Sequence, residues 1–114
     1  MSGRSPAPGA LSIACAIDNG NASLSLEGEL DLATAGTLEA RLGELEEHGS
    51  THLTVDLGGL AFIDSTGLRV LLQASARARE RGHELTLRPA CETVQQVFEI
   101  TGAQEVLRFV PPGA

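Results

Sequence analysis

The stretch Leu60-Ala-Phe-Ile-Asp-Ser-Thr-Gly-Leu68 marks the point where a short apolar stretch runs directly into a helix. Four mostly apolar residues come first, and the small polar residues Asp64, Ser65 and Thr66 follow them. Small polar residues are preferred at the N-termini of helices. Beyond them the buried positions recur with helical spacing, at Leu68, Leu71, Leu72, Ser75 and Ala78. The segment therefore predicts a polar turn that runs directly into a helix.

Upstream of this segment, apolar residues alternate with small or polar ones at 11–17 and 22–27, and each run predicts a strand. The sequence Asp18-Asn-Gly-Asn21 between the two runs is typical of a tight hairpin turn. A third strand is expected at 53–57, and we expect Gly58-Gly59 to end it. Between the second and third strands, steps of three and four predict a helix whose buried stripe is Leu32, Ala35, Leu38, Leu42 and Leu45.

Downstream, the sequence predicts a strand at 84–88, a helix at about 92–101 and a last short strand at 106–110. The buried positions expected for that helix are Val94, Val97, Phe98 and Thr101. A strand pair followed by alternating helices and strands predicts an α/β fold, a mixed sheet packed by three to four helices. One domain at 11–110 accounts for the pattern. The segment 1–10 is expected to be disordered and 111–114 to be a flexible tail.

The composition excludes several classes of partner. The net charge of −7 argues against nucleic acid and anionic membranes as partners. No apolar run approaches the roughly 20 residues of a membrane span, and the first ten residues lack the apolar stretch of a signal peptide. We therefore expect a cytoplasmic protein.

The absence of lysine excludes several kinds of enzyme, because all eight basic residues are arginine. A phosphate-binding loop of the Gly-Lys type, a Schiff-base enzyme and a receiver domain with a phosphorylated aspartate each need a lysine. Cys15 and Cys91 form no Cys-x-x-Cys pair, and the three histidines lack metal-ligand spacing. We expect no cofactor and no metal, and we expect both thiols to be buried in the core.

Ser65 lies at the predicted start of a helix, where the first backbone amides have no partner within the helix. Those amides can be satisfied by a side chain of Asp64, Ser65 or Thr66, which would make the motif a simple helix cap. The same amides can also hold a phosphate group attached to Ser65. Gly67 allows another backbone to approach closely. Spacing alone leaves both interpretations open.

Three segments in this order resemble the STAS-domain anti-sigma factor antagonists of bacterial partner switching: Gly28-Glu-Leu-Asp31, Val55-Asp-Leu57 and Phe62-Ile-Asp-Ser-Thr-Gly-Leu68. The resemblance covers about residues 11–110 and implies a single STAS domain that is not an enzyme. It implies binding to an anti-sigma factor that is also a serine kinase, which frees the sigma factor. It further implies that this kinase phosphorylates Ser65, that the phosphorylated form dissociates, and that a separate serine phosphatase restores it.

The resemblance also implies a partner-binding surface, made of Asp31, Asp64, Ser65, Thr66 and Gly67. Thr66 offers a second hydroxyl that is an alternative site of phosphorylation. Asp31 precedes a predicted helix, so it is interpreted either as a helix cap or as a partner contact. Asp56, inside a predicted strand, is interpreted as a solvated or amide-capping carboxylate and not as a metal ligand.

Two other functions remain as alternatives. The first keeps the STAS fold but makes the chain a binding subunit of a lipid-transport complex or of a stress-signalling scaffold. The second is a small nucleotide hydrolase that works through Asp31 and Asp64. The missing lysine and the lack of a phosphate-binding loop argue against the hydrolase.

Overall fold

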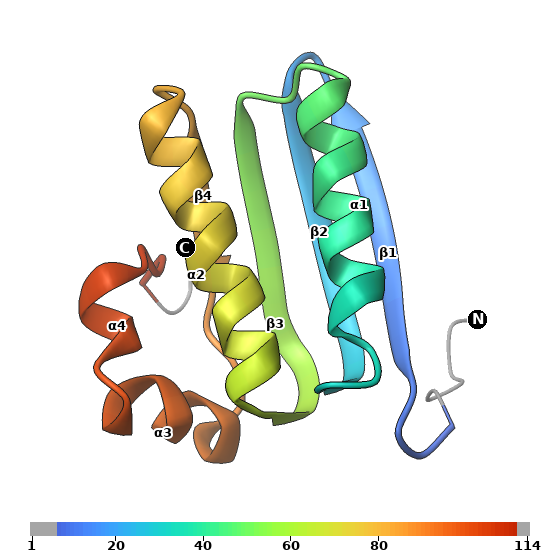
Figure 1. The fold of residues 1–114 in the computed structure, drawn as a ribbon, viewed down its shortest axis with the longest axis vertical. Coiled ribbons are helices and arrows are strands. Elements are labelled where there is room, and N and C mark those ends of the chain that lie inside the picture. The colour runs from blue at the N-terminus through green and yellow to red at the C-terminus, as the bar shows by residue number, and fades with distance from the viewer. Residues whose placement is uncertain (1–6, 112–114) are drawn as a thin grey trace.

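The computed structural model describes residues 7–111. Its elements are β1 (Leu11–Asp18), β2 (Asn21–Leu30), α1 (Ala35–Glu47), β3 (His52–Ile63), α2 (Ser65–Glu80), β4 (Glu84–Arg88), α3 (Glu92–Ile100) and α4 (Ala103–Val106) (Figure 1). The disorder expected at 1–10 and the tail expected at 111–114 fall mostly on residues 1–6 and 112–114, which lie outside the described residues.

The strands form one mixed sheet in the order β1-β2-β3-β4. β1 and β2 are antiparallel, whereas β2, β3 and β4 are parallel neighbours. The hairpin turn between β1 and β2 has positive φ at both central residues, 49° at Asn19 and 84° at Gly20. This is the turn geometry that matches the twist of two-residue hairpins and favours Asn-Gly. The predicted α/β fold with a mixed sheet is confirmed.

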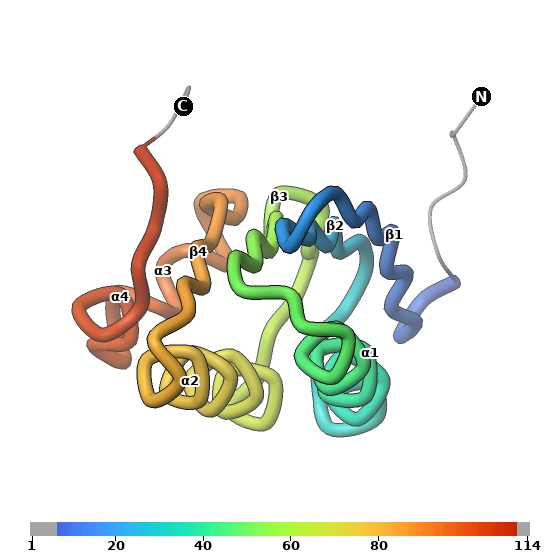
Figure 2. Tube along the Cα trace, turned by 90° about the horizontal axis from the view of Figure 1, so that it is seen from above, coloured from blue at the N-terminus to red at the C-terminus, as the bar shows by residue number. Residues whose placement is uncertain are grey.

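One face of the sheet carries α1 and α2, which lie side by side on it (Figure 2). Along β2 the apolar residues Leu24 and Leu26 are buried toward these helices, while Ser23 and Ser25 point to the opposite face. Each of the two helices likewise buries one face, because its buried positions recur every three or four residues. A single apolar layer between sheet and helices is therefore the main core.

The segment after β4 packs around Phe98, which is fully buried and meets Phe109 edge to face at 5.3 Å between ring centroids. The strand predicted at 106–110 is wrong. Residues Ala103–Val106 form the short helix α4, and between α4 and residue 111 a single parallel bridge joins Phe109 to Leu87. Thr101, expected to be buried, is exposed, because it ends α3 and donates its hydroxyl to the carbonyl of Val97 at 2.7 Å.

Gly58-Gly59 does not end the third strand, contrary to the prediction, since β3 continues to Ile63. Two shifts of register occur between β2 and β3, so β3 holds two extra residues. A Cβ atom at Gly59 would lie 2.6 Å from the carbonyl oxygen of Leu26 and 2.7 Å from Cγ of Glu27. The glycine is therefore required by the close approach of β2 at the bulge, and not by a turn.

Both cysteines are exposed, which contradicts the prediction that they belong to the core. Cys15 lies on β1, the outer strand of the sheet, opposite Leu24. Cys91 immediately precedes α3, and its thiol approaches the carbonyl of Leu60 at 3.6 Å. Small, weakly polar side chains tolerate both environments. For Cys15, the alternation of residues along β1 does not distinguish a core strand from an edge strand.

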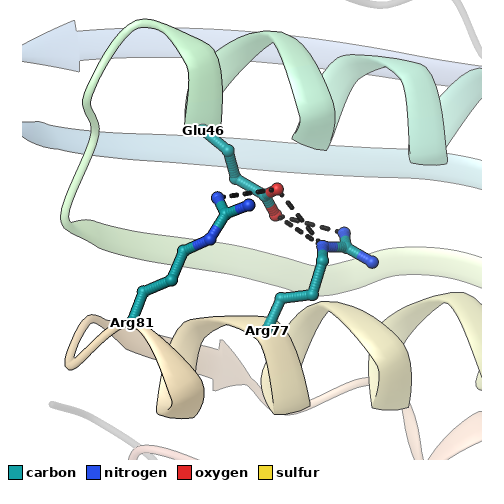
Figure 3. A network of polar contacts seen from close by, with 3 residues as sticks. All are labelled: Glu46, Arg77 and Arg81. Carbon is teal, nitrogen blue, oxygen red and sulfur yellow. Dashed lines mark hydrogen bonds and ion pairs between the residues drawn. The ribbon is translucent and has the colours of Figure 1, made fainter.

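An ion-pair network links the two helices that cover the sheet (Figure 3). The carboxylate of Glu46 in α1 accepts hydrogen bonds from Arg77 of α2, at 3.1 to 3.2 Å. Arg81, just beyond α2, also reaches this carboxylate at 3.4 Å. The Glu46 side chain is only 13% exposed, so this pairing is better shielded from solvent than an ordinary surface ion pair. It adds a polar clamp to the apolar contact between α1 and α2.

The first turn of α2 lies directly on the end of β2. Gly67 is buried, and a Cβ atom there would lie 2.6 Å from Cγ and 2.8 Å from the carbonyl oxygen of Leu30. Any side chain at this position would have to push α2 away from β2, because a backbone oxygen cannot move aside as a flexible side chain can. The absence of a side chain at Gly67 thus sets the position of the α2 N-terminus.

Replacing Gly67 with Ala is expected to lower the free energy of unfolding by about 1–3 kcal/mol through this overlap. Gly43→Ala in α1 is the matched control, because a Cβ atom there meets nothing within 4 Å. Removing a glycine from a helix interior stabilises it by roughly 0.5–1 kcal/mol. Thermal and urea unfolding should therefore shift in opposite directions for the two variants. Equal stability of Gly67→Ala and the wild type would contradict the close approach of α2 to Leu30.

Candidate functional site

The candidate site lies where the parallel strands β2 and β3 end, at Leu30 and Ile63, which are partners in the sheet. Asp31 directly follows the first of these strands, and Asp64 directly follows the second. The amide of Asp64 donates to the carbonyl of Leu30 at 3.1 Å, so the two loops are joined at their start. Residues that are far apart in the chain thereby meet at one edge of the sheet.

Asp64 is the cap of α2, and its carboxylate joins the two loops. Its Oδ1 accepts a hydrogen bond from the amide of Gly67 at 3.0 Å. Its Oδ2 accepts one from the amide of Leu32 at 3.0 Å, in the loop between β2 and α1. Of the three cap candidates that the sequence offered, the structure selects Asp64. The Ser65 hydroxyl is therefore not needed to cap the helix.

Ser65 is the first residue of α2, and its side chain is exposed. Its hydroxyl makes no hydrogen bond to any residue between 7 and 111. Thr66, the alternative hydroxyl, is only half-exposed. The N-terminus of a helix carries roughly half a positive charge, and anions are stabilised there. Ser65 is thus the more accessible of the two hydroxyls and lies at the end of α2 that favours an anionic group.

Asp31 shapes the loop between β2 and α1. Its Oδ1 accepts hydrogen bonds from the amides of Ala33 at 3.0 Å and Thr34 at 3.2 Å, which closes a turn. The hydroxyl of Thr34 in turn donates to the carbonyl of Glu29 at 2.8 Å. Asp31 therefore caps the turn of residues 31–34, which immediately precedes α1. Its Oδ2 accepts no hydrogen bond from the part of the chain that the structure describes, which leaves it available to a partner.

Leu32 does not belong to the buried stripe of α1, contrary to the prediction. Its side chain is 78% exposed. The reason is the turn at Asp31, which delays the start of the helix to Ala35 and turns Leu32 outward. The stripe from Ala35 to Leu45 is buried as predicted. Sequence reasoning missed Leu32 as a surface residue; the signal for it is the Asp-x-x-Thr spacing of residues 31–34, which is typical of a side-chain-capped turn.

The remaining predicted residues occupy distinct places. Gly67 is buried beneath the site and supports it through the contact with Leu30. Asp56 accepts a hydrogen bond from the amide of Gly58 at 2.8 Å within β3, as expected for an amide-capping carboxylate. Between residues 7 and 111, no group of three or more His, Cys, Asp or Glu side chains is arranged to hold a metal ion. Nor is any helix there long and apolar enough to cross a membrane.

Comparison with known proteins identifies the family. The sequence profile described as "Mlab, STAS domain" matches residues 13–110. The anti-sigma-F factor antagonist RsfB of Mycobacterium tuberculosis is 39% identical over 71 residues, which are 62% of this chain and 58% of RsfB. The match thus spans less than two thirds of that relative. The anti-sigma-B factor antagonist of Listeria monocytogenes is 30% identical over 92 residues, 81% of each protein.

The fold also matches a solved structure. The crystal structure of an anti-sigma factor antagonist from Mycobacterium paratuberculosis superposes with a TM-score of 0.78 at 23% identity, over 94% of this chain and 91% of that one. At this identity the likeness supports the architecture alone, and the family assignment rests on the sequence matches. The chain belongs to the STAS-domain family, and the relatives named here are anti-sigma factor antagonists.

Proposed function

We propose that this protein is a cytoplasmic anti-sigma factor antagonist controlled by phosphorylation of Ser65. In its unphosphorylated form it binds an anti-sigma factor that is also a serine kinase, and the sigma factor is released. The kinase transfers a phosphate from ATP to Ser65, the complex dissociates, and a separate serine phosphatase restores the binding form. The protein itself catalyses no reaction and needs no cofactor, nucleic acid or membrane.

The observation that carries this proposal is the setting of Ser65. Its hydroxyl is exposed and unbonded to the described residues, and it begins α2 directly beside the capping carboxylate of Asp64. A kinase can reach such a hydroxyl without unfolding the helix, because Asp64 and not Ser65 is the cap. The names of RsfB and of the Listeria relative support the choice of an anti-sigma factor as the partner.

The charge of the site explains how a phosphate would weaken binding. Asp64 and Asp31 already place two carboxylates around the start of α2. A phosphate adds about −1.5 to −2 charges at pH 7. A partner surface that fits the unphosphorylated site must then face both the added charge and the added bulk. A penalty of about 3 kcal/mol would lower the affinity more than a hundredfold.

Replacing Ser65 with Ala is expected to abolish phosphate incorporation and to leave partner binding intact. The reason is that the substitution removes the acceptor hydroxyl but keeps the Asp64 cap. Each anti-sigma factor encoded by the host genome would be purified and incubated with the protein and ATP, and phosphate would be located by mass spectrometry. Thr66→Ala is the matched control and should still be phosphorylated. Wild-type phosphate uptake by Ser65→Ala would transfer the assignment to Thr66.

Replacing Asp31 with Asn separates capping from charge, because the amide oxygen of asparagine accepts the same two backbone hydrogen bonds. The melting temperature should therefore stay near the wild-type value. Affinity for the anti-sigma factor should fall about tenfold, the usual cost of losing a charged hydrogen bond. Asp56→Asn removes the same charge from a similar cap within β3 and should bind normally. If titration calorimetry gives equal affinities for both variants and the wild type, Asp31 is only a turn cap.

Replacing Ser65 with Asp should weaken binding less than phosphorylation does. A carboxylate brings one negative charge and two acceptor oxygens, whereas a phosphate brings nearly two charges and three oxygens. The fold should be unaffected, since an acidic side chain is favourable in the first turn of a helix. Calorimetric titration of all three forms against one partner tests the order. Tight binding by Ser65→Asp combined with no binding by the phosphoprotein would mean that bulk, and not charge, is the switch.

A further inference from the structure

Leu32 exposes a large apolar side chain to solvent, at 78%. Exposure alone says little, because single apolar residues are common on protein surfaces. Ile100, at the end of α3, is exposed to 83%. What distinguishes Leu32 is the way its backbone is held and the neighbours that hold it.

The backbone on both sides of Leu32 is fixed by hydrogen bonds. Its own amide donates to Oδ2 of Asp64 at 3.0 Å. On one side, the amide of Asp31 donates to the hydroxyl of Thr34 at 3.0 Å, and on the other, the amide of Ala33 donates to Oδ1 of Asp31 at 3.0 Å. A side chain on such a fixed turn loses little backbone entropy when a partner covers it. Leu32 is therefore presented in a form that is already ordered for binding.

Leu32 is also coupled in position to Ser65. The same Asp64 carboxylate that accepts from the Leu32 amide accepts from Gly67 and so caps the helix that Ser65 begins. The backbone of the exposed leucine and the helix that begins at the exposed serine are thus held by one carboxylate. A partner that contacts both residues would therefore meet them in a fixed backbone arrangement.

We propose, resting on the function proposed above, that Leu32 is the apolar anchor of the partner-binding surface. It enters an apolar pocket of the anti-sigma factor. Charge complementarity defines the rim of that pocket, because Leu32 is flanked by the carboxylates of Asp31 and Asp64. Oδ2 of Asp31 is open to a hydrogen bond, so the partner presents basic or amide donors around its pocket. In many complexes a few residues carry most of the binding energy; they lie near the centre of the interface in desolvated pockets, ringed by contacts that exclude water.

The test is a titration of Leu32→Ala against the anti-sigma factor that binds the wild type. We expect the dissociation constant to rise about thirtyfold, the size of a binding hot spot, and the KM for phosphorylation of Ser65 to rise with it. The melting temperature should not change, because the side chain is exposed. Leu32→Met keeps an apolar side chain of similar volume and should bind within about threefold of the wild type. Ile100→Ala is the matched control at a second exposed apolar residue and should bind normally.

The outcomes separate this inference from the proposed function. If the wild type binds and Leu32→Ala binds within twofold of it, the anchor role is overturned and the proposed function stands. The anchor role is also overturned if Ile100→Ala weakens binding as much as Leu32→Ala does, since the loss is then not specific to Leu32. If none of the host anti-sigma factors binds the wild type, the proposed function falls and the anchor role falls with it.

Discussion

The candidate site depends on the two hydrogen bonds that the carboxylate of Asp64 accepts. One oxygen accepts a hydrogen bond from the amide of Gly67 in the first turn of α2. The other accepts a hydrogen bond from the amide of Leu32 in the loop before α1. Each of these bonds is an ordinary cap or turn contact, worth about 1 kcal/mol. Their importance comes from being made by one side chain. The start of α2 and the turn at Asp31 cannot move independently while both bonds hold. The backbone positions of Leu32 and Ser65 relative to each other therefore stay fixed.

The sheet brings Asp64 to this position through an irregularity in β3. Near its start Leu53 pairs with Ala22, but at its end Ile63 pairs with Leu30, because β3 contains two more residues than β2 over the same span. Without the two register shifts Leu30 would pair with Ala61, and Asp64 would lie beyond the loop that it now joins. Gly59 makes the bulge possible, since no side chain fits there beside Leu26. A feature in the middle of β3 thus decides which residues meet at its end.

Much of this architecture could be predicted because the responsible signals are local. Asn19-Gly20 specifies a hairpin turn through positive φ, and the leucines from Leu38 to Leu45 specify a buried helix face through their spacing. Two of the failures share one cause: they depend on which element lies next to which. Gly59 indicates a turn unless β2 is known to approach it, and Cys15 indicates a core residue unless β1 is known to be the outer strand. Leu32 fits the apolar stripe until the turn at Asp31 removes it.

The candidate site could also be predicted in part, because the sequence signal for its helix cap is local. The motif around Ser65 places a polar cap at the start of a helix, and the structure has that cap. Asp64 is chosen over the two hydroxyls because α2 begins at Ser65, so that Ser65 and Thr66 lie inside its first turn. The identity of the capping residue affects how the proposed phosphorylation switch works. Gly67 donates its amide to Asp64, whereas the amides of Ser65 and Thr66 bond to no described residue. A phosphate on Ser65, as proposed, would therefore meet these two amides without displacing Asp64, and the loops would remain joined. The proposed modification changes the charge and bulk of the surface over an unchanged fold.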